Sequence, residues 1–309
     1  MESQQVGAEV QSLYDAYPYP AHGIVSSVVP RLIAASLESL TVELGRRDLR
    51  VLDAGCGTGE QTLGLAKAYP ELDVTGIDIT KASLDFARNL GVQHGIEARF
   101  EHHDLSRPLP ESLGTFDVIT SIGVLHSLPD TPAGFRHVRA VARPHTLFLG
   151  MVYGTFGREG FYRIRDVLNM ITPSRDEQLR VLDEGRLAHN AGWLHYLDTL
   201  EKRLRFGPKI DPVEAVRRVV AGRSAQYQAD AYTHVKDTSY TWDELAELLT
   251  ATGWLLEGWP ERSGMPDRPE QLFRGRALEL VRGSSKLEQA RIYERVVRPG
   301  NLYFLARPA

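Results

Sequence analysis

The sequence is poor in features that would crosslink the chain, export it or insert it into a membrane. It contains one cysteine, Cys56, among 309 residues, so no disulfide bond can form within the chain. No run of about 18 apolar residues is present, and we therefore expect no membrane-spanning helix. The first residues lack a basic segment followed by an apolar core, so we expect no secretory signal. These absences predict a cytoplasmic protein.

The chain also lacks an excess of basic residues. Lysine and arginine number 36, against 40 aspartate and glutamate residues, which gives a formal net charge of -4. General nucleic-acid binders usually carry a basic excess, so we expect no nucleic-acid partner. The hydrophobic share of 42% and the charged share of 25% are those of an ordinary globular protein.

Strand and helix patterns alternate between Arg50 and Tyr153. Such alternation is typical of an α/β fold whose parallel sheet is covered by helices on both faces. A helix with Thr241 at its N-cap and two short apolar runs near the C-terminus extend the pattern. We predict a Rossmann-like sheet that is seven-stranded and mostly parallel. The predicted strands are 49–55, 72–80, 97–105, 116–124, 145–153, 254–259 and 301–307, and the predicted helices are 59–70, 81–95, 133–144 and 240–254.

Two segments fall outside this alternation. Residues 1–49 are helical in pattern but are interrupted by the prolines of SLYDAYPYPAHG. Residues 154–240 are mainly helical in pattern and rich in aromatic side chains. We therefore divide the chain into an N-terminal helical segment (1–49), a sheet core (50–153), a helical insert after the fifth strand (154–240), and the last helix and strands of the core (241–309).

A glycine-rich loop, in VLDAGCGTGEQT, follows the first predicted strand. Glycine permits positive φ and a close approach of backbone to ligand, and the following helix directs free N–H groups at the loop. Dinucleotides and S-adenosylmethionine (SAM) are both bound in this way. Gly55 and Gly57 match the first two glycines of the dinucleotide pattern G-x-G-x-x-G, but Glu60 stands at the third. A carboxylate there would oppose a pyrophosphate, whereas SAM has no phosphate group.

The stretch from Asp53 through Gly55 and Gly57 to Gly59 resembles the first motif of the class I SAM-dependent methyltransferases, D/E-x-G-x-G-x-G. The resemblance implies that this acid and the glycine loop hold the methionine end of SAM. Asp78, at the end of the second strand, resembles the acid that accepts hydrogen bonds from both ribose hydroxyls. The resemblance to this family also implies that S-adenosylhomocysteine (SAH) is the product.

Further positions follow from the same resemblance. Asp104, after the third strand, matches the residue that accepts from the adenine amino group, although the adjacent His103 competes for this role. Leu105 would offer its backbone N–H beside it, and Ile79 would lie against the adenine face. FDVITSIGVLHSLPD resembles the fourth-strand motif, in which the backbone of Ser121 would contact the cofactor. The motifs occur in order over residues 51–153, and the resemblance is looser over 240–307.

The N-terminal segment resembles the lid that closes over SAM in related methyltransferases. Tyr14 and Tyr19 lie in a Y-x-x-x-P-Y-P pattern, and we expect one of them to touch cofactor or substrate. The alternative is that they pack under the edge of the sheet. We count Tyr19 among the candidate cofactor contacts and Tyr14 among the candidate catalytic residues.

His126, after the fourth strand, is the candidate general base, because a neutral imidazole can take a proton from an acceptor near pH 7. The alternative is a loop histidine that packs against a helix. Asp230, Tyr232 and His234 alternate in sequence and would share one face of an extended segment, either lining an acceptor pocket or displayed on the surface. No ligand cluster has the spacing of a metal site, so we expect no metal.

The acceptor is predicted from what the fourth strand lacks. The pattern N/D-P-P-Y of enzymes that methylate DNA amino groups or protein glutamine is absent, and residues 120–123 read Thr-Ser-Ile-Gly instead. The aromatic-rich insert favours a small, flat acceptor: a phenol, an indole (including its ring carbon) or another specialised metabolite methylated on oxygen, nitrogen or carbon. The alternatives are a peptide or protein methyltransferase, a non-catalytic SAM-binding regulator and a NAD enzyme. The sequence leaves the acceptor atom and the oligomeric state open.

Overall fold

The computed structural model describes residue 9 and residues 11–13, 28–183, 232–234 and 236–309, and every structural statement below concerns these residues. The chain divides into two compact units. The sheet unit comprises Met1–Phe156 and Lys236–Ala309, and the insert unit comprises Gly157–Val235.

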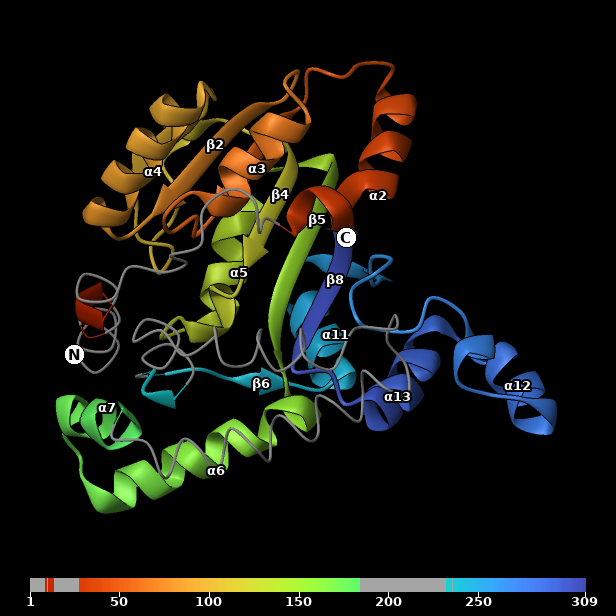
Figure 1. The fold of residues 1–309 in the computed structure, drawn as a ribbon. Coiled ribbons are helices and arrows are strands. Elements are labelled where there is room, and N and C mark those ends of the chain that lie inside the picture. The colour runs from red at the N-terminus through yellow and green to blue at the C-terminus, as the bar shows by residue number, and fades with distance from the viewer. Residues whose placement is uncertain (1–8, 10, 14–27, 184–231, 235) are drawn as a thin grey trace. The chain divides into compact units, whose positions relative to one another are not determined.

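The sheet unit is built on one mixed sheet (Figure 1). Its strand order is β3-β2-β1-β4-β5-β8-β7, with the short β6 paired to the end of β5. Strands β1 to β6 are parallel, and β8 runs antiparallel to both β5 and β7. The predicted seven-stranded, mostly parallel sheet is confirmed, and the two-residue β6 was not predicted. The strands are β1 Arg50–Ala54, β2 Asp73–Asp78, β3 Arg99–His102, β4 Phe116–Ile122, β5 Ala142–Gly154, β6 Ser239–Tyr240, β7 Trp254–Gly258 and β8 Asn301–Pro308.

The order of the strands indicates which edge of the sheet is suited to bind a ligand. The chain moves outward from β1 to β2 and β3, then returns to the other side of β1 to form β4 and β5. In open parallel sheets, ligands bind at the carboxyl ends of the strands where the order reverses in this way. The carboxyl ends of β1 and β4 are that point here.

Helices cover both faces of the sheet (Figure 1). On one face α2, α3 and α4 pack their apolar side chains against β1, β2, β3 and β4. On the other face α5 and α11 pack against β1, β4, β5 and β8. Their bounds are α2 Val29–Leu44, α3 Glu60–Ala68, α4 Lys81–His94, α5 Thr131–Ala140 and α11 Trp242–Ala251. Thr241 caps α11 through a reciprocal bond with Glu244, which confirms the predicted N-cap.

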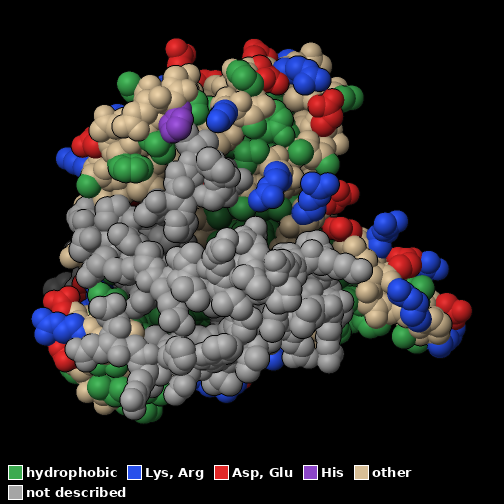
Figure 2. Space-filling model, viewed as in Figure 1, with side chains coloured by type: hydrophobic (Ala, Val, Ile, Leu, Met, Phe, Trp, Pro, Cys, Tyr) green, Lys and Arg blue, Asp and Glu red, His purple; other side chains and the backbone are tan. Residues whose placement is uncertain are grey.

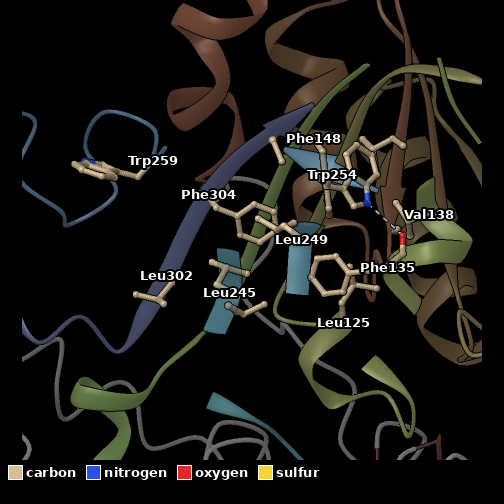
Figure 3. Close-up of a cluster of buried hydrophobic side chains, with 14 of the residues drawn as sticks. Leu125, Phe135, Val138, Phe148, Leu245, Leu249, Trp254, Trp259, Leu302 and Phe304 are labelled. Carbon is tan, nitrogen blue, oxygen red and sulfur yellow. Dashed lines mark hydrogen bonds between the residues drawn. The ribbon is translucent and has the colours of Figure 1, made fainter. Parts of the chain in front are cut away.

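Aromatic rings fill the core under α5 and α11 (Figure 3). The Phe148 ring lies 4.7 Å from Trp254 and 5.2 Å from Phe304, measured between ring centroids. The buried indole N–H of Trp254 donates to the carbonyl of Phe135 at 3.3 Å, so it is not left unsatisfied. Gly150 on β5 leaves room for the Phe304 ring, because the Cβ atom of any other residue at this position would lie only 2.1 Å from that ring.

Two sequence expectations need correction. The helix expected at 133–144 ends at Ala140, and β5 begins at Ala142. Pro144 falls in an irregular stretch where the pairing of β4 with β5 shifts register, because proline cannot donate to the strand ladder. The link between β7 and β8, to which no element was assigned, contains η4 Pro269–Gln271, α12 Gly275–Arg282 and α13 Lys286–Val297. Ser285 and Glu288 form a capping box at the start of α13, which the sequence could have revealed.

Helices α6 and α7 form the first part of the insert unit. Helix α6, Thr155–Ile171, starts directly after β5, and α7, Arg175–Asp183, follows a short turn. The Gln178 amide donates to Asn169 Oδ1 and to the Thr172 carbonyl, both at 2.9 Å, and so ties α7 to the end of α6. The rest of the expected helical insert, at 184–231, lies outside the described residues.

The described residues contain neither a candidate membrane-spanning helix nor a candidate metal cluster. No helix among the described residues has both the length and the apolar character needed to cross a membrane. Within the same residues, no group of three or more His, Cys, Asp or Glu side chains is placed to hold a metal ion. On the face shown in Figure 2, basic and acidic side chains are interspersed.

We predict that Asp117, at the start of β4, contributes strongly to stability. It is fully buried, and burial alone would raise its pKa, but hydrogen bonds from His145, Arg50 N–H, Arg46 and Arg143 lower the pKa to about 2. The stabilisation should be complete above pH 4 and be lost as pH falls from about 4 to 2, amounting to about 2–3 kcal/mol.

Urea unfolding at several pH values tests this. Asp117→Asn should lower the free energy of unfolding by about 2–4 kcal/mol at pH 7, because two guanidinium groups lose a buried anion. Asp48→Asn is the control: that side chain is 82% exposed, and the change should cost less than about 0.5 kcal/mol. Equal effects of the two substitutions would contradict the role given to Asp117.

Candidate functional site

The loop between β1 and α3 has the backbone conformation that its glycines predict. Gly55, Gly57 and Gly59 have φ of 86, 50 and 81 degrees, in the left-handed region that other residues rarely adopt. The N–H groups of Gly55 and Cys56 donate to the carbonyl of Ile77 at 2.8 and 2.9 Å, which ties the loop to the end of β2.

The loop also lies close to the segment after β4. A Cβ at Gly55 would lie 2.4 Å from a methyl group of Val124. Gly55 and Gly57 themselves stay partly exposed, so their backbone is open to a ligand. The loop therefore has the form needed for close contact between backbone and ligand.

Asp53 lies beneath this loop and is 2% exposed. The Thr62 hydroxyl donates to its Oδ2 at 2.6 Å, and the Thr120 hydroxyl donates to its Oδ1 at 2.9 Å. Burial raises the pKa of the Asp53 carboxyl to about 6, and the two hydroxyl bonds only partly offset this. Asp53 thus joins β1, α3 and β4 from below, with both of its oxygens already engaged by the protein.

Asp78 ends β2 and is partly exposed. Its Oδ2 accepts from the Gly57 N–H and its Oδ1 from the Thr80 N–H, each at 2.9 Å. Burial raises the pKa of Asp78, and these amide bonds act in the opposite direction. Each carboxylate oxygen retains capacity for a further donor, so the group can accept from two neighbouring hydroxyls.

The residues after β2 and β3 lie next to one another. The His103 N–H donates to the Asp78 carbonyl at 2.9 Å, which joins the two strand ends. Asp104 is partly exposed and its Oδ1 accepts from the Ser106 N–H at 2.8 Å. Leu105 is buried, and its carbonyl bonds to His137 Nδ1 at 3.0 Å. Asp104 and His103 are both partly exposed, so burial does not separate these two candidate acceptors.

Ile79 connects this edge to the N-terminal segment. Its side chain is partly exposed, and its carbonyl bonds to His102 Nε2 at 2.8 Å. The Gln11 amide nitrogen lies 3.5 Å from the same carbonyl oxygen, at the limit of a hydrogen bond. Tyr14 and Tyr19 lie outside the described residues.

Two of the predicted site residues lie near the end of β4: Ser121 is in the strand, and His126 is in the loop that follows. The Ser121 hydroxyl donates to the Ala54 carbonyl at 2.8 Å and is buried, so only its backbone is left for a ligand. His126 is 0% exposed, and its ring lies 4.0 Å from that of Tyr153, between centroids. An acceptor therefore reaches the imidazole only when neighbouring groups move.

Residues 236–240, here called the return segment, hold the His126 loop. The Thr238 N–H donates to the His126 carbonyl at 3.0 Å, and Lys236 Nζ donates to the Pro129 carbonyl. Ser239 and Tyr240 then pair with the end of β5. Neither the return segment nor Tyr153 was predicted, because their part in the site arises from pairings between segments about 90–110 residues apart.

Asp230, Tyr232 and His234 do not form the expected alternating face. Asp230 lies outside the described residues, and Tyr232 has a helical rather than an extended backbone. Tyr232 is 8% exposed and His234 is 4% exposed, so both side chains are buried, and Tyr232 packs against Phe161 of α6.

The described residues fit SAM better than a dinucleotide. Glu60 is the first residue of α3 and is 4% exposed, so a carboxylate already occupies the helix N-terminus where a pyrophosphate would bind. Asp53 and Asp78 add two more carboxyl groups to this edge. A cationic ligand without phosphate matches this set of groups, and a doubly anionic pyrophosphate does not.

We predict a dependence of stability on pH that comes from Asp53. Because its pKa is higher in the folded state than its ordinary value of 3.8, the folded protein holds the proton more tightly. Stability from this group should therefore be present below about pH 4 and be lost as pH rises to about 6, by up to about 3 kcal/mol. Asp53→Asn removes this titration.

Unfolding free energies of wild type and Asp53→Asn, measured from pH 4 to pH 7, should differ by an amount that changes across this range. A constant difference would show that the Asp53 carboxyl has no raised pKa.

Comparison with known proteins agrees with this geometry. Residues 51–145 match a family described as a methyltransferase domain. The ubiquinone biosynthesis O-methyltransferase of Bordetella avium is 35% identical over 95 residues, which cover 31% of this chain and 39% of that protein. The trans-aconitate 2-methyltransferase of Deinococcus radiodurans is 40% identical over 99 residues, covering 32% and 35%.

Two longer matches extend over most of the chain. An uncharacterized protein of Synechococcus is 26% identical over 273 residues, which cover 85% of this chain and 62% of that protein. The structure of PKMT2 from Rickettsia typhi has a TM-score of 0.62 at 16% identity, covering 85% of this chain and 49% of that one. The chain thus spans less than two thirds of the length of each of these proteins.

The glycine loop and the acids at the ends of β1 and β2 lie within the segment that matches this family. Residues 51–145 form a methyltransferase domain of the class I S-adenosylmethionine-dependent family.

Proposed function

We propose that the protein is an enzyme that transfers the methyl group of SAM to a small aromatic acceptor. The observation that carries this proposal is the bond between Asp78 and the Gly57 N–H at 2.9 Å. It sets a partly exposed carboxylate beside an open glycine loop at the edge where the strand order reverses. The carboxylate of Glu60 at the start of α3 supports SAM over NAD.

On this proposal the cofactor lies along the carboxyl ends of β1, β2 and β3. The backbone of Gly55, Gly57 and Gly59 faces the methionine end, with Asp53 fixing the loop from below. Asp78 accepts from the two ribose hydroxyls. The adenine lies against Ile79, with its amino group toward Asp104 and with the Leu105 N–H and the Ser121 backbone completing the contacts.

The N-terminal segment is proposed to close this site. Gln11 lies near the Ile79 carbonyl, which places it beside the proposed adenine position, and Leu13, two residues on, is 1% exposed. Tyr14 and Tyr19 follow within a few residues of this contact. We propose that they contact cofactor or acceptor when both are bound.

Bound SAM supplies an electrophilic methyl carbon: a bond from the acceptor atom to that carbon forms as the carbon–sulfur bond breaks, and the electron pair stays on sulfur to give SAH. The protein must align the acceptor and exclude water. An acceptor that carries a proton must also lose it, and His126 at the end of β4 is the proposed base. The Thr238 bond to its carbonyl and the ring of Tyr153 hold it in place.

A small aromatic acceptor is supported by the residues around His126. The pattern N/D-P-P-Y is absent from the end of β4, where Ser121 turns its hydroxyl toward Ala54. Tyr153 brings an aromatic ring to the end of β5 beside His126. Phenols and indoles are acceptors with a flat ring and, in each case, a proton that a base can remove.

Asp78→Ala should weaken SAH binding by about 1.5–3 kcal/mol, because a carboxylate that accepts from two hydroxyls is removed. Titration calorimetry of SAH with the purified protein gives the affinity. Asp85→Ala, on the exposed side of α4 where Asp85 is 71% exposed, serves as the matched control and should bind SAH as wild type does.

Unchanged SAH affinity in Asp78→Ala would remove the ribose assignment. Binding of NAD by the wild type, with no binding of SAH, would overturn the proposed cofactor and with it the proposed function.

His126→Ala should reduce turnover by about 10²–10⁴-fold while SAH affinity changes little, since general-base catalysis contributes on this scale. The measurement is SAH release from SAM with a panel of phenols and indoles, across pH 5.5–9. His94→Ala, at the exposed end of α4, is the control. Wild-type turnover by His126→Ala at every pH would reject the role of base.

A further inference from the structure

The start of helix α2 is held by a side chain from α3. Val28 is the N-cap residue of α2, and a valine side chain has no oxygen that could accept from the N–H groups of the first turn. The N–H groups of Val28 and Val29 donate instead to Gln61 Oε1, at 3.0 and 3.1 Å. Gln61 therefore supplies the capping acceptor that the N-cap residue of α2 lacks.

Gln61 lies directly beside the glycine loop. Gly59, the last glycine of that loop, is the N-cap of α3, and Gln61 is the second residue of the helix. The N–H groups in the first turn of a helix have no partner within the helix and point toward the preceding loop. The bonds from Val28 and Val29 therefore join α2 to the turn that borders the proposed cofactor site.

The remaining contacts between α2 and α3 do not involve Gln61. The Tyr69 hydroxyl, at the C-terminal end of α3, donates to the Pro30 carbonyl at 3.2 Å. The two helices also lie side by side through apolar side chains of one buried cluster (Figure 1). Because these contacts remain when Gln61 is replaced, its effect on the cofactor site can be measured in a folded protein.

The N-terminal segment reaches the same edge of the sheet at a second described position. The Gln11 amide nitrogen lies 3.5 Å from the carbonyl oxygen of Ile79, which directly follows β2. Gln61 belongs to the helix that follows β1. Residues 11 and 28 thus both contact residues that come just after the carboxyl ends of strands, where the cofactor is proposed to bind.

We infer that Gln61 is a positioning residue for the methyl-transfer reaction, because it couples the start of α2 to the glycine loop. It acts through the N–H groups of Val28 and Val29 and does not touch the reacting atoms. Cofactor in the loop and the bonds to Gln61 both restrict the first turn of α3, so each favours the other. This inference rests on the proposed function, since it names a residue that supports the cofactor site of that reaction.

Substitutions at Gln61 test the coupling through SAH affinity, measured by titration calorimetry on the full chain. Gln61→Met removes the acceptor at similar side-chain size and should weaken SAH binding about tenfold, the scale of one or two lost hydrogen bonds. Gln61→Glu keeps an acceptor oxygen and should stay within about threefold of wild type. Gln93→Met, the same substitution at an exposed position of α4, is the control and should bind SAH as wild type does.

Hydrogen exchange of the Val28 and Val29 amides, followed by NMR, gives a readout that a purely structural cap would not change. Since coupling is reciprocal, SAH should slow the exchange of these two amides about tenfold in wild type and in Gln61→Glu. In Gln61→Met, SAH should change their exchange by less than about twofold.

The outcomes separate this inference from the proposed function. Wild-type SAH affinity in Gln61→Met, equal losses in Gln61→Met and Gln61→Glu, or exchange at Val28 and Val29 that does not respond to SAH in wild type would overturn the inference. If Gln61→Met fails to fold by circular dichroism, the exchange measurement on wild type decides. Failure of the wild type to bind SAH contradicts the proposed function itself, whereas SAH binding that is independent of Gln61 contradicts only the positioning role.

Discussion

The buried carboxylate of Asp53 fixes the geometry on which the site depends. Its backbone belongs to β1, and its side chain accepts from Thr62 on α3 and Thr120 on β4. The Asp53 side chain therefore joins three elements, next to the carboxyl ends of β1 and β4, where the strand order reverses. Because β1 and α3 are fixed in this way, the short loop between them can adopt few backbone conformations, and glycines with positive φ complete the turn.

The same edge concentrates negative charge. Asp53, Asp78 and Glu60 stand within one loop and two strand ends, and the charge of Asp78 adds to burial in raising the pKa of Asp53. A cationic ligand at this edge lowers the free energy of both carboxylates and favours their ionised forms, so binding and proton release are linked. An added phosphate has the opposite effect. The fold is shared by both ligand classes, and these side chains separate them.

The parts of the structure that the sequence predicted depend on short-range signals. The glycine loop after an apolar strand, and the reciprocal cap of Thr241 with Glu244, are each contained within a few residues. The strands next to them follow from apolar runs, and the parallel sheet follows from their alternation with helices.

The parts that could not be predicted depend on contacts between distant segments. Asp117 forms hydrogen bonds with Arg46, which is 71 residues away in sequence, and with Arg143 and His145, which are 26 and 28 residues away. The pairing of Tyr153 with His126, and the bond from Thr238 to the His126 carbonyl, likewise need the folded sheet.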